Sequence, residues 1–196
     1  MALMRSPDLP TLHEDERRAL LALARASIEH GLKQGVPLLV VLDLQPPALQ
    51  TPGAAFVTLQ RHAQLRGCIG SLEAHRPLAQ DVAENAYAAA FRDPRFPPLT
   101  AAEWGDIRVS ISVLTPAVPI PCASEDELLA ALQPGIDGLI LAEDARRGTF
   151  LPAVWTQLPE PRDFLRQLKR KAGLSAEHWS PRMRAWRYRA DGFGED

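Results

Sequence analysis

Residues 65–70, Leu-Arg-Gly-Cys-Ile-Gly, bring together the residue types best suited to carry out chemistry in this chain. In an extended strand successive side chains alternate between two faces, so Arg66 and Cys68 are predicted to share a face. A guanidinium beside a thiol favours the thiolate, the form of cysteine that attacks electrophiles. Gly67 and Gly70 would allow a positive φ or the close approach of a ligand to backbone N–H groups that could hold an oxyanion. The segment is therefore a candidate catalytic site, with Cys68 as nucleophile and Arg66 supporting its thiolate.

The same segment has a structural interpretation. Free cysteine is among the most buried residue types, so Cys68 is alternatively a small core residue and the glycines shape a bulge. His62 and His75 are close in sequence, and either could act as a general base or simply lie in a loop. Cysteine and histidine lack metal-motif spacing here, so neither a metal site nor a cofactor is predicted.

A second candidate feature is the proline-containing turn at residues 91–99, which carries Arg92 and Arg95. Two guanidiniums on a rigid loop could clamp a carboxylate or phosphate in bidentate fashion. Alternatively, one of them pairs with Asp93 or Asp81 and pins the loop.

Asn85 lies on a polar stripe of the helix that precedes this turn. Such a stripe is either a solvated face or, because Asn85 borders apolar neighbours, a partly buried hydrogen-bonding position. The candidate substrate-binding residues are Gly67, Gly70, Asn85, Arg92 and Arg95.

Hydrophobic periodicity and turn residues predict the elements that position these side chains. The predicted helices span residues 12–33, 77–91, 124–132 and 161–173. The predicted strands span residues 38–42, 54–60, 65–69, 107–114, 138–141, 149–151 and 184–189, with a hairpin joining the second and third. Hairpins rather than regular crossovers indicate an α+β fold with a mainly antiparallel sheet and flanking helices.

Composition excludes several classes of protein. At 196 residues, 46% hydrophobic and 23% charged, the chain is neither disordered nor fibrous. A net charge of −2 provides no general attraction to nucleic acid, which is a disfavoured partner, or to anionic membranes. The longest apolar run, residues 36–42, is too short to span a bilayer. Two cysteines and no recognisable secretion signal predict a cytoplasmic protein with reduced thiols.

Five segments together resemble the AMMECR domain family, whose bacterial branch is called AmmeMemoRadiSam system protein A. In chain order they are residues 65–70, 90–96, 111–114, 150–155 and 171–174. The resemblance covers residues 14–193 and implies an AMMECR-type domain at residues 11–193, between an extension at 1–10 and a tail at 194–196. It also implies two lobes, a cleft near the cysteine motif, and a Memo-like protein and a radical SAM protein as partners, but no specific reaction.

Two classes of function follow. In the first, the chain is an enzyme in which Cys68 attacks a small anionic or nucleotide-like substrate bound by Arg92 or Arg95. In the second, it is a non-catalytic module that binds a ligand or docks onto its partners through exposed aromatic anchors. The anchors would come from Trp104, Trp155, Trp179 and Trp186.

Overall fold

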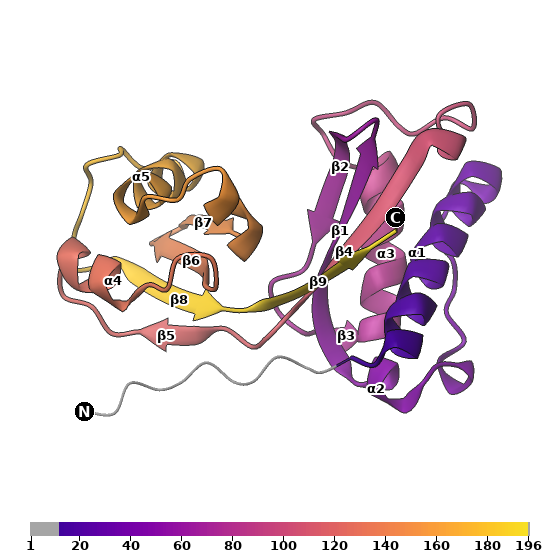
Figure 1. Cartoon of the computed structure of the whole chain (residues 1–196), viewed down its shortest axis with the longest axis horizontal. Helices are drawn as coiled ribbons and strands as arrows, with labels where there is room; N and C mark the ends of the chain where they lie inside the picture. Colours follow the sequence, from indigo (N-terminus) through magenta and orange to yellow (C-terminus); the bar gives the residue numbers. More distant parts are fainter. Residues whose placement is uncertain (1–11, 196) are drawn as a thin grey trace. The chain divides into compact units, whose positions relative to one another are not determined.

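The computed structural model describes residues 12–195, which divide into two compact units (Figure 1). The host unit comprises residues 12–114 and 191–195, and the inserted unit comprises residues 115–190. The predicted α+β fold, mainly antiparallel with flanking helices, is confirmed. The predicted extension at residues 1–10 lies outside the described residues, and the bounds at 11 and 193 remain predictions.

The host unit is a sheet covered on one face by helices. Its strands run in the order β2 (Gln64–Gly70), β1 (Pro52–Arg61), β4 (Ile107–Leu114) and β9 (Ala190–Gly194), and β3 (Arg76–Pro77) pairs with the start of β1. The helices are α1 (Glu14–Gln34), α2 (Pro47–Gln50) and α3 (Leu78–Phe91), with 3-10 turns at Leu42–Leu44 and Trp104–Asp106.

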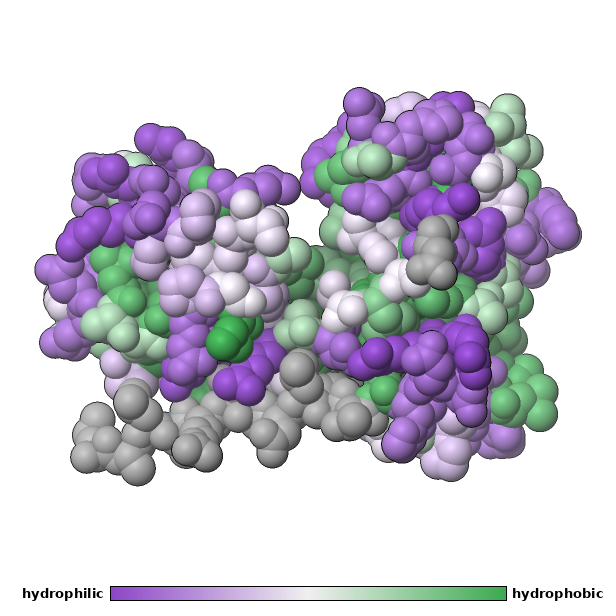
Figure 2. Space-filling view, in the orientation of Figure 1, coloured by the Kyte–Doolittle hydropathy of each residue, from purple (hydrophilic) through white to green (hydrophobic). Residues whose placement is uncertain are grey.

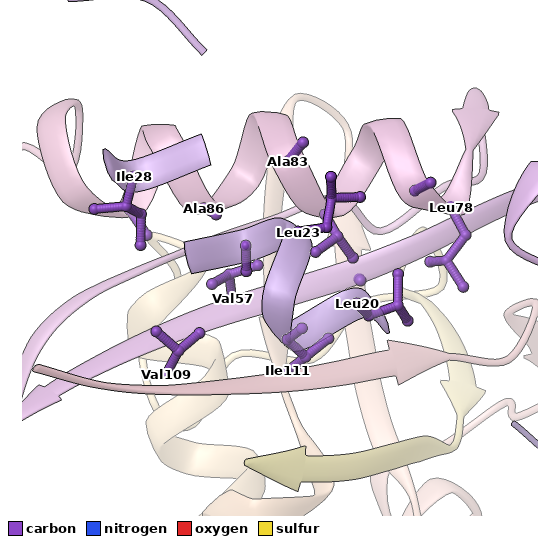
Figure 3. Packing of buried hydrophobic residues seen from close by; sticks show 14 of the residues in the cluster. Leu20, Leu23, Ile28, Val57, Leu78, Ala83, Ala86, Val109 and Ile111 are labelled. Atoms are coloured by element: carbon purple, nitrogen blue, oxygen red, sulfur yellow. The ribbon is translucent and has the colours of Figure 1, made fainter. Parts of the chain in front are cut away.

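Alternation along the strands decides which face the helices cover. Ile107, Val109 and Ile111 of β4 are at most 1% exposed, whereas the residues between them are half-buried or exposed. Figure 3 shows side chains of α1 and α3, including Leu20 and Ala86, packed over Val109, Ile111 and the β1 residue Val57. The opposite face therefore carries the polar residues of the same strands.

The β1–β2 hairpin contains a register shift that matters for the site. His62 and Ala63 form its turn with φ of 50° and 61°. Leu59 pairs with Gly67 but Gln60 pairs with Leu65, so the residue between them has no opposite partner. This bulge at Arg66 rotates the strand relative to the ideal alternation.

The predicted strand at residues 38–42 is wrong. These residues form no ladder, and the chain enters a 3-10 turn at Leu42. Apolar β-branched composition favours a strand, but a ladder needs a neighbouring strand, and none lies beside this segment within residues 12–195.

The inserted unit is a second antiparallel sheet with its own core. Its sheet order is β5 (Val118–Ile120), β8 (Arg184–Tyr188), β6 (Gly138–Glu143) and β7 (Arg146–Phe150), packed with α4 (Glu125–Ala131), α5 (Pro161–Lys171) and a 3-10 turn at Pro152–Thr156. Trp155 stacks on Phe164 with ring centroids 3.8 Å apart. Among the described residues no helix is long and apolar enough to cross a membrane.

Candidate functional site

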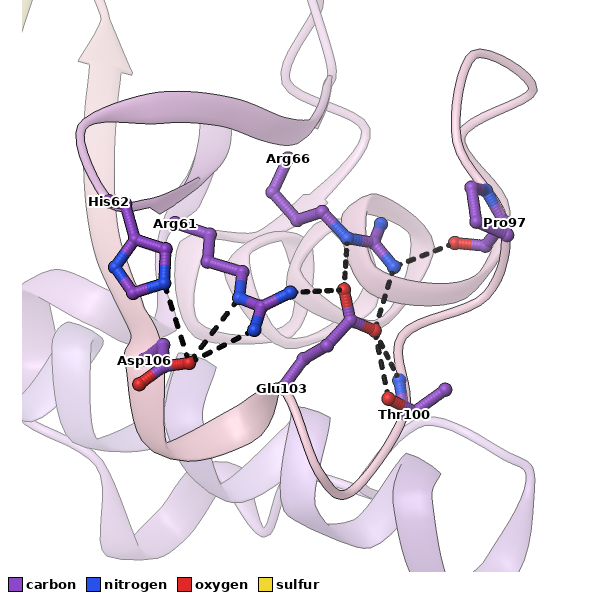
Figure 4. A network of polar contacts seen from close by, with 7 residues as sticks. All are labelled: Arg61, His62, Arg66, Pro97, Thr100, Glu103 and Asp106. Atoms are coloured by element: carbon purple, nitrogen blue, oxygen red, sulfur yellow. Dashed lines mark hydrogen bonds and ion pairs between the residues drawn. The ribbon is translucent and has the colours of Figure 1, made fainter.

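Arg66 engages a carboxylate. Its Nε donates to Glu103 Oε1 at 2.8 Å, and its Nη2 donates to Glu103 Oε2 at 3.1 Å and to the Pro97 carbonyl at 3.0 Å (Figure 4). Mainly through the Arg66 hydrogen bond, the pKa of Glu103 falls from 4.5 to about 2. Arg66 is the bulged residue of β2 and is only 8% exposed. Its hydrogen bonds to Glu103 and to the Pro97 carbonyl hold the loop of residues 97–103 against β2.

The hairpin turn belongs to the same polar network. Arg61 reaches Asp106 at 3.1 Å and Glu103 at 3.6 Å, and His62 Nε2 lies 3.7 Å from Asp106 (Figure 4). His75 is exposed. Within residues 12–195 neither histidine hydrogen bonds to Cys68, so the candidate site contains no imidazole base from these positions.

Asp93 and Arg95 form a clamp on the backbone of Cys68. Asp93 is 4% exposed and accepts from the Cys68 N–H at 2.8 Å, from Arg95 Nε at 2.9 Å and from Arg95 Nη2 at 2.7 Å. Arg95 Nη2 also donates to the Cys68 carbonyl at 3.1 Å. The Arg95 hydrogen bond is the main reason that the pKa of Asp93 falls to about 2.

Arg95 therefore lies beside the candidate nucleophile. Asp93 chiefly raises the pKa of Arg95, and the charge and hydrogen bonding of the Cys68 side chain act in the same direction. The Arg95 side chain remains 53% exposed. The structure thus brings Cys68 together with Arg95 and engages Arg66 with Glu103.

The thiol lies in a row of small polar residues on the helix-free face of the host sheet. Thr58 is directly opposite Cys68, and its hydroxyl donates to Cys68 Sγ at 3.3 Å. On the other side of β1, Thr58 is paired with Ser110, and a Cβ added to Gly194 of β9 would meet the Ser110 Cβ at 3.0 Å. The row Cys68, Thr58, Ser110, Gly194 therefore crosses four strands.

A second row runs beside it. Phe56 pairs with Gly70 on one side and Ser112 on the other, and Gly192 lies near Ser112. Because most of these residues are glycine or serine, few side chains project from this part of the sheet face, and Phe56 is the large one.

The motif glycines have packing roles. A Cβ on Gly67 would come within 2.1 Å of the Ala89 carbonyl oxygen of α3, and one on Gly70 would meet the Phe56 ring at 2.3 Å. Neither glycine has a positive φ. Gly67 thus allows β2 to approach α3 closely. In a single sequence, a glycine needed for such packing looks the same as a glycine needed for ligand binding.

Asn85 and Arg92 lie elsewhere in the host unit. Asn85 is 5% exposed and donates to the Ala55 carbonyl, Ser71 and Asp81, the partly buried hydrogen-bonding position that the sequence offered as an alternative. The Arg92 guanidinium stacks over the Tyr87 ring at 5.0 Å.

Four residues of this arrangement were not selected from the sequence as site residues: Thr58, Asp93, Glu103 and Ser110. From the sequence, Asp93 is expected only as a salt-bridge partner of Arg92 or Arg95. The alternation of residues 107–114 places Ser110 away from the core, but only the strand pairing puts Thr58 beside Cys68 and Ser110 beside Thr58. Within the described part of the chain no three histidine, cysteine or acidic side chains are grouped to hold a metal.

The AMMECR1 family model matches residues 21–193. A protein from Methanothermobacter thermautotrophicus is 38% identical, covering 94% of this chain and 97% of its own. Protein MK0488 from Methanopyrus kandleri is 34% identical, covering 95% and 90% respectively. The crystal structure of the uncharacterised protein PH0010 from Pyrococcus horikoshii superposes with a TM-score of 0.89, with 32% identity and 94% coverage of both chains. These relatives are archaeal.

Proposed function

Since this chain belongs to the AMMECR1 family, we propose that the cysteine motif of that family forms its reactive site. In this proposal the chain is a cysteine-dependent enzyme acting on a small anionic or nucleotide-like substrate, and is component A of a system with a Memo-like protein and a radical SAM protein. The observation that carries the proposal is the position of Cys68 Sγ, which accepts a hydrogen bond from Thr58 and lies beside Arg95.

Both neighbours would interact favourably with a negatively charged sulfur. A hydroxyl that donates to sulfur and a cation nearby are the features of reactive cysteine sites. In the proposed step the thiol first loses its proton to solvent. The sulfur then forms a bond to an electrophilic carbon of the substrate, and the leaving group departs with the electron pair of its own bond.

The surroundings support an anionic substrate of low profile. Arg95 uses Nε and Nη2 for Asp93 and the Cys68 carbonyl, so the Nη1 of this half-exposed side chain can donate to an anion beside the thiol. The floor formed by Ser110, Gly192 and Gly194 offers one hydroxyl donor, that of Ser110, and little steric obstruction.

A second candidate function is a non-catalytic binding or docking module. The observation that favours it is that the N–H and C=O of Cys68 are both engaged, by Asp93 and Arg95. That N–H therefore cannot stabilise an oxyanion unless the clamp opens. In this version Arg95 and the flat sheet face bind a ligand or partner without covalent chemistry.

The rate of Cys68 alkylation as a function of pH separates the two functions. Iodoacetamide labelling, followed by intact-protein mass spectrometry, would use a Cys122→Ser background. Cys122 itself is a contrasting thiol, because burial and then Glu127 raise its pKa. If the enzyme proposal is right, Cys68 labels rapidly at pH 6 to 7, and Thr58→Val and Arg95→Gln each slow labelling there about 3- to 10-fold, as expected for one lost hydrogen bond.

Ser110→Ala is the matched control, because Ser110 shares the row but, within residues 12–195, it is Thr58 and not Ser110 that hydrogen bonds to the thiol. The labelling rate of Ser110→Ala should equal that of the parent. Labelling of Cys68 no faster than that of a free cysteine peptide, and unchanged in all three variants, would refute the enzyme proposal. Binding of the purified Memo-like or radical SAM protein that survives Cys68→Ser would then support the docking module.

A further inference from the structure

The segment between α1 and α2 exposes an unusual amount of apolar surface. Six large hydrophobic residues of the described chain are prominently exposed, and four of them fall within residues 36–44, hereafter the apolar segment. They are Val36, Leu39, Val41 and Leu44, at 50%, 87%, 57% and 79% exposure. Figure 2 shows hydrophobic surface at the lower right edge, where Figure 1 places this segment. Contiguous exposed apolar surface of this kind marks interaction sites.

The apolar segment has the form of a strand, and residues 12–195 provide no strand that pairs with it. Val40 is buried, while Leu39 and Val41 on either side of it are exposed, which is the alternation of a strand. Val41 has extended backbone angles, φ −83° and ψ 101°. Among the hydrogen bonds of residues 12–195 none uses the backbone N–H of Leu39, Val40 or Val41.

The Val41 carbonyl accepts from the Leu44 N–H at 3.3 Å, but the unused N–H groups distinguish this edge from the outer edge of β2. There the N–H and C=O of Cys68 are covered by Asp93 and Arg95, so charged side chains block the addition of another strand. No charged residue lies between Val36 and Leu42 to protect the apolar segment in the same way.

We propose that the apolar segment pairs with the same segment of a second copy of this chain, as antiparallel strands related by a two-fold axis. An antiparallel pair centred on Val40 places Leu39 of one copy opposite Val41 of the other, so apolar side chains meet apolar side chains. Since the segment is uncharged over residues 36–42 and the chain carries a net charge of only −2, little electrostatic repulsion opposes the pairing.

The size of the segment predicts a weak dimer. Four exposed side chains present on the order of a few hundred Å². A stable interface buries roughly 800 Å² on each partner. The dimer is therefore expected to have a Kd from tens to hundreds of micromolar, which corresponds to a binding free energy of about −5 to −6 kcal/mol.

Sedimentation velocity of the full chain from about 5 to about 500 µM tests the proposal over this affinity range. Leu39→Lys places a charge at an 87% exposed position. Val41→Pro removes one backbone N–H that donates no hydrogen bond to residues 12–195, at a φ that proline tolerates. Ile136→Lys is the matched control, because Ile136 is 47% exposed and lies in the inserted unit.

If the proposal holds, the wild type and Ile136→Lys dimerise with the same Kd, and Leu39→Lys and Val41→Pro each raise the Kd at least tenfold. Circular dichroism checks that every variant is folded. A wild type that stays monomeric throughout overturns the proposal, as does association that Val41→Pro leaves intact, which would mean apolar contact without strand pairing. A monomer that binds neutral lipid vesicles through Leu39 would instead assign the segment to a membrane surface.

Discussion

Replacing Asp93 by asparagine should remove the clamp on β2 and cost the host unit about 2–3 kcal/mol. The fall in the pKa of Asp93 from 3.8 to about 2 corresponds to about 2 kcal/mol, at about 1.4 kcal/mol per pKa unit. Asparagine keeps one carbonyl oxygen, which in place of Oδ2 can still accept from the Cys68 N–H and from Arg95 Nη2. Its NH2 group replaces Oδ1, so the Nε and the backbone N–H of Arg95 lose their acceptor. An orphaned buried donor adds about 1–3 kcal/mol, partly overlapping the first contribution.

The stability that Asp93 contributes should depend on pH, and its lowered pKa determines the direction. The pKa of Asp93 is lower in the folded state, so its contribution to stability is complete well above pH 3.8 and is lost as pH falls toward 2. At pH 3 about half of it should remain. The difference between the wild type and Asp93→Asn in urea unfolding, followed by circular dichroism, should therefore be largest at pH 6 to 7 and should narrow between pH 5 and 3.

Asp106→Asn is the control for a general effect of losing a carboxylate. Asp106 pairs with Arg61 at 3.1 Å, but both side chains are about 40% exposed, so its loss should cost less than about 1 kcal/mol. The reasoning fails if the two variants lose equal stability, or if the Asp93→Asn difference stays constant from pH 7 to pH 3.

Two further substitutions test the same region. Glu103→Gln leaves the buried Arg66 guanidinium without its carboxylate, and it should lower the free energy of unfolding in urea by about 3–5 kcal/mol. Because the pKa of Glu103 is lowered to about 2 in the folded state, the wild type should lose its stability advantage over this variant as the pH falls below about 4.5. Gly67→Ala forces a Cβ against the Ala89 carbonyl and should lower Tm by several degrees, whereas Gly105→Ala, with open space around its Cβ, should change it little; equal Tm values would refute the packing role of Gly67.

Much of the host fold follows from the sequence, because its signals are local. The alternation from Ile107 to Leu114 predicts both the bounds of β4 and its buried face, and the structure has the same bounds. The helical stripe from Leu78 to Phe91 likewise predicts α3. Each pattern is long enough for periodicity to identify the element and its buried side.

The site depended on non-local information. Ideal alternation places Arg66 beside Cys68, but the bulge between Leu59 and Gln60 breaks that alternation, and Glu103, 37 positions away, accepts the guanidinium. Similarly, Arg95 reaches Cys68 because a turn folds back on the sheet edge. Pairing partners and bulges are set by tertiary packing, so local spacing does not determine which arginine approaches the thiol.

The insertion of one unit within the other determines the order in which the chain can complete its fold during synthesis. The ribosome releases residues 12–114 first, but the fourth strand of their sheet is β9, which emerges only after all of residues 115–190. Until then β4 has an open edge, and the ion pairs of Arg17 with Asp191 and of Arg25 with Glu195 cannot form. The nascent host unit therefore passes through a stage with an unpaired strand while the inserted unit is made, a stage at which association with other chains competes with folding. A chain shortened by its last few residues would remain in that state permanently.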